Sequence, residues 1–165
     1  MSEVAAAARL SLGVADFASI DESGKLNIIG GNVGFLGFDP MQGLTTRFTV
    51  WAHIALPHHI LPAELSIELA LLDDRGRVFE IGGPLGSQAV RMAQPITIDK
   101  SSAPVIPALR EHMGSSHQMV VDFGSGLPLQ PNGTYVWRLQ IDGDEDFELR
   151  YPLGVAGPPP GPVIG

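Results

Sequence analysis

Residues 64–72 read ELSIELALL, and this stretch decides the fold class. Large aliphatic side chains occupy every second position, namely Leu65, Ile67, Leu69 and Leu71. A helix with one buried face needs apolar residues three and four apart, whereas strict alternation places them on one face of a strand. The segment therefore predicts a β-strand with one face in a hydrophobic core.

The same alternation recurs in three other segments of the chain. Their predicted inward residues are Phe48, Val50, Ala52 and Ile54, then Tyr135, Trp137, Leu139 and Ile141, and finally Phe147, Leu149 and Tyr151. Further strands are expected at residues 10–18, 26–35, 77–81, 90–98 and 118–123. Roughly eight or nine strands at regular spacing predict an all-β fold, an antiparallel β-sandwich.

Turn residues separate these runs. Gly-containing segments with acidic residues at 22–25, 73–76 and 142–145 predict hairpin turns, and the glycines of residues 30–37 predict a bulge or bend. One short helix is expected at residues 107–113, inside a long connection. We expect a single sandwich domain over residues 1–155 and an extended Pro/Gly-rich tail over residues 156–165.

Composition narrows the classes of function. The 165 residues are 44% hydrophobic and only 17% charged, with a net charge of −8 and no cysteine. Disulfides and thiol catalysis are excluded, and an acidic chain without a basic cluster is not expected to bind nucleic acid or a membrane surface. No secretory signal is recognised before Arg9, so we expect a cytoplasmic protein of a bacterium or one incorporated in a virion.

Candidate metal and catalytic motifs are incomplete. His53 points outward from its strand, and His58 and His59 are adjacent in a turn, a spacing that disfavours joint ligation of one ion. Asp142, Asp144 and Asp146 alternate as at the start of a calcium loop, but Phe147 stands in place of the glycine that such a loop requires. A weak calcium site between this turn and Asp73-Asp74 stays open, while the sequence predicts no catalytic residue and no cofactor.

Two Ser-containing segments do not complete a nucleophile motif. Gly114-Ser115-Ser116 is followed by Gln118 where a nucleophile elbow needs glycine, and Gly124-Ser125-Gly126 follows a strand as a simple loop. The chain is therefore expected not to be an enzyme.

Candidate contact residues fall into three groups. Trp51 and His53 share the predicted outer face of a strand, where they either form an exposed patch or are covered by the second sheet. The other two groups are the helical connection and the proline-rich tail. The complete set is Trp51, His53, Pro107, Leu109, Arg110, Pro158, Pro159 and Pro160.

Several segments together resemble a known family. They are Ala15-Asp16-Phe17, Gly24-Lys25-Leu26-Asn27-Ile28-Ile29-Gly30, Leu72-Asp73-Asp74-Arg75-Gly76, and Leu129-Gln130-Pro131-Asn132-Gly133-Thr134-Tyr135 running into Ile141-Asp142-Gly143. In this order they resemble an uncharacterised bacterial and phage family of small β-sandwiches with no assigned activity. The resemblance implies the fold and brings no catalytic residue.

These observations favour a non-catalytic structural or protein-interaction module. We expect a subunit of a homo-oligomer or larger particle, such as a capsid decoration or tail component of a phage virion, because a surface poor in charge is often covered by protein partners. The alternative is a ligand-binding module, for carbohydrate or for a calcium-dependent contact, that uses the Trp51 face or the acidic turns.

Overall fold

Residues 64–72 lie within β7 (Ala63–Leu72), and the four aliphatic side chains of their alternation are buried, as predicted. In the computed structural model, which describes residues 3–84, 86–100, 106, 109 and 112–157, β7 belongs to a five-stranded sheet with the strand order β10-β7-β12-β13-β3. The other strands of this sheet are β10 (Arg91–Ile98), β12 (Thr134–Ile141), β13 (Glu148–Val155) and β3 (Phe35–Leu36).

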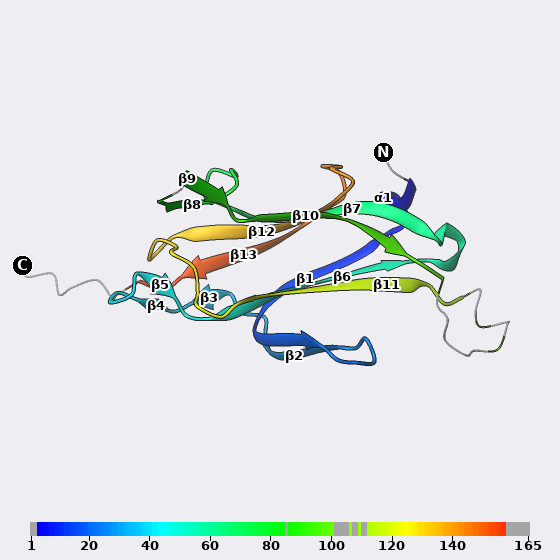
Figure 1. Ribbon diagram of the computed structural model, residues 1–165, viewed down its shortest axis with the longest axis horizontal. Helices are drawn as coiled ribbons and strands as arrows, with labels where there is room; N and C mark the ends of the chain where they lie inside the picture. Colours follow the sequence, from blue (N-terminus) through cyan, green and yellow to red (C-terminus); the bar gives the residue numbers. More distant parts are fainter. Residues whose placement is uncertain (1–2, 85, 101–105, 107–108, 110–111, 158–165) are drawn as a thin grey trace, which may run out of the picture.

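A four-stranded sheet packs against it, with the order β11-β6-β1-β2 (Figure 1). Its strands are β11 (Ser115–Phe123), β6 (Phe48–Leu56), β1 (Arg9–Ile20) and β2 (Leu26–Gly31). Every pairing in the two sheets is antiparallel except the short parallel contact between β13 and β3. The predicted all-β antiparallel sandwich is confirmed, because the described residues form sheets of four and five strands.

The core lies between the two sheets. Phe48 on β6 stacks on Phe123 of β11 with ring centroids 4.9 Å apart, and Phe123 lies 5.4 Å from Trp137 on β12. Trp137 has no exposed surface, so its ring joins the two sheets at the middle of the sandwich. The predicted inward residues of β6 and β12 are all buried, which confirms both assignments of phase.

Two of the predicted hairpin turns are built by aspartates. The Asp73 carboxylate accepts hydrogen bonds from the backbone N–H groups of Arg75 and Arg77, and these bonds hold the pKa of Asp73 below its usual value. Asp142 has a positive φ of 52° and accepts the backbone N–H of Ser66 at 2.8 Å. This second contact ties the β12–β13 turn to the start of β7.

Several small elements were not predicted from the sequence. They are α1 (Glu3–Ala7), a 3-10 turn η1 (His58–Ile60), and two small two-stranded sheets, β4 (Phe38–Asp39) with β5 (Leu44–Thr45) and β8 (Glu80–Gly83) with β9 (Gly86–Ala89). The segment expected as one strand at 77–81 contributes a bridge from Val78 to Leu72 and the first two residues of β8. These elements are too short to show a period in the sequence.

The prediction of one strand over residues 26–35 is wrong. Gly30 and Asn32 adopt positive φ angles of 62° and 63°, so β2 ends at Gly31 and the chain crosses to the other sheet as β3. Asp16 explains why position 30 requires glycine, because a side chain at position 30 would collide with the Asp16 carboxylate. The predicted bend in the glycine run is confirmed, and Asp16, which shares the inward phase of β1, is exposed to solvent.

The predicted helix at residues 107–113 and the tail fall largely outside the described residues. Leu109 is described, and its carbonyl accepts hydrogen bonds from the N–H groups of His112 and Met113. Of the tail, residues 156 and 157 are described, so its extended form stays a prediction, as does the division into a domain and a tail. Neither of the described helical segments has the length and apolar character needed to cross a bilayer.

Candidate functional site

Trp51 and His53 lie on the outer face of the four-stranded sheet, as the alternation predicts. The register places Trp51 between Gly13 of β1 and Val120 of β11. The indole lies over Gly13, where a Cβ atom would come within 2.6 Å of Trp51 Cζ2. Trp51 is therefore half-buried on its own sheet, and the second sheet does not cover it.

His53 is flanked by polar residues in the next row of that face. Its neighbours are Ser11 on β1 and Gln118 on β11. In the row on the other side of Trp51, Thr49 donates a hydrogen bond to Asp122 and has no exposed surface. Thr49 thus does not extend the patch, which is limited to two half-buried side chains.

The other predicted contact residues are only partly described. Leu109 is 50% exposed. Pro107, Arg110, Pro158, Pro159 and Pro160 lie outside the described residues. Their role as contact residues stays a prediction.

The hairpin formed by residues 16–31 carries a larger exposed apolar surface, which the sequence reasoning missed. We call this hairpin, the second half of β1 with β2, the arm; Figure 1 shows it projecting below the four-stranded layer. Phe17 and Ile29 are paired on its outer face and are 41% and 64% exposed. Ile20 and Ile28 on the opposite face are 43% and 39% exposed, because the second sheet does not extend over them.

The tip of the arm is fixed by one carboxylate. Asp21 accepts hydrogen bonds from the Ser23 hydroxyl and from the backbone N–H groups of Ser23 and Lys25. The Ser23 hydroxyl and the Lys25 N–H lower the pKa of Asp21. The turn is therefore well defined even though the arm buries only Ala18, and a two-stranded hairpin with so little buried surface is marginal by itself.

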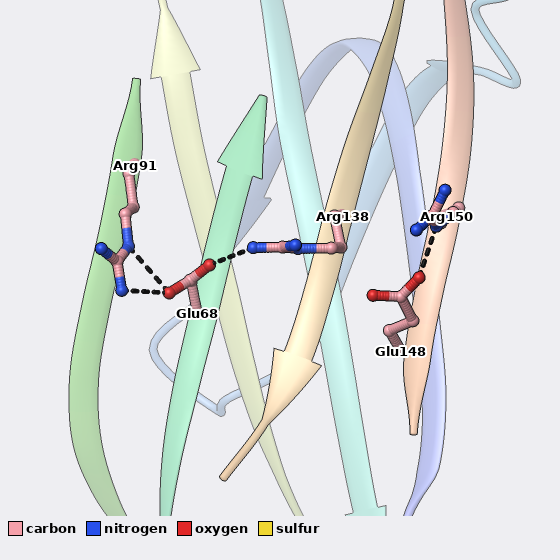
Figure 2. Close-up of polar contacts among 5 residues, drawn as sticks. All are labelled: Glu68, Arg91, Arg138, Glu148 and Arg150. Carbon is pink, nitrogen blue, oxygen red and sulfur yellow. Dashed lines mark hydrogen bonds and ion pairs between the residues drawn. The ribbon is translucent and has the colours of Figure 1, made fainter. Parts of the chain in front are cut away.

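The outer face of the five-stranded sheet is different, because it carries several ion pairs (Figure 2). Glu68 on β7 lies between Arg91 on β10 and Arg138 on β12 and forms an ion pair with each. Glu148 pairs with Arg150 on β13. Arg91, Arg138 and Arg150 each already have a carboxylate partner, so this face is better explained as a solvated charged surface than as an anion site.

Several clefts open on the described surface. One, of about 640 Å³, is lined by the Asp73 turn and the 130–135 segment, including Asp74, Phe79, Gln130, Asn132 and Tyr135. A second, about 540 Å³, is lined mainly by apolar atoms beside Arg9, His59 and His112. A third, about 220 Å³, is an apolar groove beside Met92 and Phe123.

The acidic turns do not meet. The register of β12 with β7 places Asp142 beside Ser66, at the first half of β7, whereas Asp73 follows the last residue of that strand. The two turns are thus at opposite ends of β7, which removes the calcium site between them. In the described part of the chain, no three His, Asp or Glu side chains are grouped as metal ligands would be.

Burial lowers the pKa of His117, whose side chain is on the core-facing side of β11.

No protein-family model matches this chain, and no curated protein matches it. Among solved structures, it is similar to a β-glucosidase from Listeria innocua, determined with gluconolactone, at 9% identity and a TM-score of 0.43 over 91% of the chain. The chain spans only 16% of that glucosidase chain. It is also similar to the ApaA protein from Bordetella pertussis at 16% identity and a TM-score of 0.32, over 92% of this chain and 96% of the other. Likenesses this distant carry no argument about function.

Replacing Gly13 by alanine should displace the Trp51 indole. The new methyl group overlaps the ring, so the ring must move toward solvent, and we expect a red-shifted Trp51 emission and a loss of about 1–2 kcal/mol in the free energy of unfolding. Steady-state fluorescence and urea denaturation measure both. Gly34→Ala is the matched control, because its Cβ would meet no atom within 4 Å; equal effects of the two variants would contradict the packing described.

Replacing Glu68 by glutamine should destabilise the chain by about 1 kcal/mol, because Arg138 is only 20% exposed and loses its anionic partner. Glu148→Gln is the control, since its partner Arg150 is 59% exposed and such pairs contribute little. Urea denaturation of both variants compares them. A stabilised Glu68→Gln variant, or a larger loss in the control, would contradict this ranking.

Proposed function

We propose that this chain is a non-catalytic protein-interaction module, a subunit of a larger assembly, and that the arm is its main contact surface. One observation carries the proposal: four large apolar side chains, Phe17, Ile20, Ile28 and Ile29, are exposed on the two faces of one hairpin. Isolated exposed apolar residues are ordinary, but a group of them on one element is typical of a protein contact.

The stability of the arm supports the same conclusion. A two-stranded hairpin that buries little more than Ala18 gains little from its own hydrogen bonds and exposes its larger apolar side chains to water. Cover by a partner removes that apolar surface from water and adds packing on both faces. The other large exposed residues, such as Met41 at 95% and Leu109 at 50%, lie on other elements and do not belong to this surface.

A substitution in the arm should release the chain from its assembly. With tagged protein produced at native level in cells of the source organism, we expect the wild type to sediment with particles much larger than its own 17.5 kDa, and Ile29→Lys to shift to the light fractions. Density-gradient fractionation followed by immunoblotting measures the shift. Lysine is used because it is readily solvated on a free hairpin but costly in an apolar contact.

Met41→Lys is the matched control, since Met41 is even more exposed but lies in the turn between β4 and β5. It should leave the sedimentation unchanged. Wild-type protein found only in the light fractions, or the same shift in both variants, would argue against the proposed function. Circular dichroism of each purified variant confirms that the fold is intact.

A second candidate function, binding of a small carbohydrate ligand, is supported by the cleft of about 640 Å³. The cleft combines the aromatic rings of Phe79 and Tyr135, which meet edge to face at 5.5 Å, with the polar side chains of Asp74, Gln130 and Asn132. Apolar ring surface with carboxylate and amide groups is a suitable lining for a sugar. The Tyr135 hydroxyl already accepts the Gln130 N–H, which holds the ring in place.

This candidate predicts binding that depends on Asp74. We expect a glycan that binds the wild type in an array to lose at least about tenfold in affinity with Asp74→Ala, as expected for a lost hydrogen bond to a charged group. Isothermal titration calorimetry, with and without calcium, measures the affinity. Glu145→Ala, an exposed acid in the turn at the other end of the sandwich, should have no effect. The absence of any binding glycan would remove the candidate.

A further inference from the structure

The outer edge of β2 differs from the other edges of the two main sheets. The edge strand β10 contains Arg91 and Pro95, the edge strand β11 contains Asp122, and β3 has only two residues. Charges, proline and short length are the usual means by which a sheet edge avoids pairing with another chain. β2, with the sequence LNIIGG, has six residues and neither a charge nor a proline.

The backbone groups at this edge follow from the hairpin register. Asp21 N–H donates to the Lys25 carbonyl, so this pair is hydrogen-bonded, and hydrogen-bonded pairs alternate along an antiparallel hairpin. Leu26 and Ile28 are therefore the residues in the regular part of β2 that direct N–H and C=O away from β1, whereas Gly30 departs from strand geometry with a φ of 62°. In the described part of the chain β2 has a strand neighbour on one side only, so this row of donors and acceptors faces outward.

We propose that β2 pairs with β2 of a second copy of this chain, antiparallel across a two-fold axis at Ile28. This inference rests on the proposed function and names the partner of the arm. The pairing joins the two four-stranded sheets into one continuous sheet of eight strands. In this pairing, apolar side chains on both faces of the arm contact the second copy, and the outward-directed backbone N–H and C=O groups of β2 form hydrogen bonds with it.

The self-complementarity of β2 carries the choice of partner. With Ile28 opposite Ile28 of the second copy, each Leu26 lies opposite a Gly30 and each Asn27 lies opposite an Ile29. The outward-directed N–H and C=O groups of the two Ile28 residues then pair across the axis, and the Gly30 position leaves room for the Leu26 side chain. Each copy carries a net charge of −8, and a charged contact between copies would repel. The uncharged β2 brings two copies together with no like charges directly opposed.

The surface available sets the strength of the contact. From their exposed fractions, the four side chains of the arm leave roughly 350 Å² uncovered on each copy. Two arms with their paired backbones thus bury at most about 1,000 Å², which is the low end of the range for specific interfaces. We therefore expect a reversible dimer with a dissociation constant in the micromolar range.

The absence of cysteine from the natural chain provides a direct test. Ile28→Cys places one thiol on each copy at the two-fold axis, where opposed Cα atoms of a hydrogen-bonded pair are about 5.5 Å apart, within the range that a disulfide spans. Under mild oxidation at a protein concentration of about 10⁻⁵ M, we expect the covalent dimer to form at least about tenfold faster than with Met41→Cys. Non-reducing gel electrophoresis and mass spectrometry measure the rate.

Equilibrium measurements on the cysteine-free chain complete the test. Sedimentation velocity should show a concentration-dependent dimer for the wild type, and Ile28→Pro should remove it. Proline at this position deletes an N–H that faces outward and leaves the bonds between β1 and β2 in place. Ile28→Ala, which keeps the N–H but shortens the side chain, should weaken the dimer less, and the unfolding transition of each variant verifies the fold.

Three results would overturn the self-pairing. They are a wild type that stays monomeric up to about 10⁻⁴ M, cross-linking of Ile28→Cys no faster than that of Met41→Cys, and a dimer that Ile28→Pro leaves intact. If the purified chain is monomeric while Ile29→Lys still releases it from a cellular assembly, the proposed function stands and the arm binds a different protein. If neither effect is seen, both proposals fail.

Discussion

The fold depends on the burial of two apolar sheet faces against each other. Trp137 has no exposed surface, and Phe123 connects its ring to Phe48, so both sheets contribute to one aromatic centre. Each large side chain buried in this way contributes roughly 1.5–3 kcal/mol, and with no disulfide in the chain this burial is the main favourable contribution to folding. The positions of the loops, the turns and the outer faces follow from this core, because these features connect or flank the strands that form it.

The two outer faces have opposite characters. On the five-stranded sheet, Glu68 pairs with arginines across the strands and Glu148 pairs with Arg150 along its own strand. On the four-stranded sheet, the indole of Trp51 is held against Gly13, and beyond it the sheet continues into the arm, where Phe17 and Ile29 are exposed. Four of the large apolar side chains that are exposed on the described surface, Phe17, Ile20, Ile28 and Ile29, thus lie together on the arm.

A steric constraint creates the arm. Gly30 has a positive φ of 62° and lies directly under the Asp16 carboxylate, so the strand that begins at Leu26 cannot continue along the sheet past Gly31. The chain leaves β2, crosses to the other sheet as β3, and the hairpin remains as a projection with a free edge. The same bend that closes the sandwich therefore produces its most apolar exposed element.

The sequence by itself determined the fold class, the phase of the core strands and the hairpin turns, because alternation and Asp-Gly turn chemistry are local properties of the chain. It predicted that Trp51 and His53 face outward, and the structure places them there, half-buried rather than fully exposed. Only the tertiary structure decided that Phe17, Ile20, Ile28 and Ile29 are exposed. The sequence pattern of an alternating apolar strand is the same whether or not a second sheet packs on it. Which residues are packed against depends on where the other sheet ends, and that is determined by contacts between residues far apart in the chain.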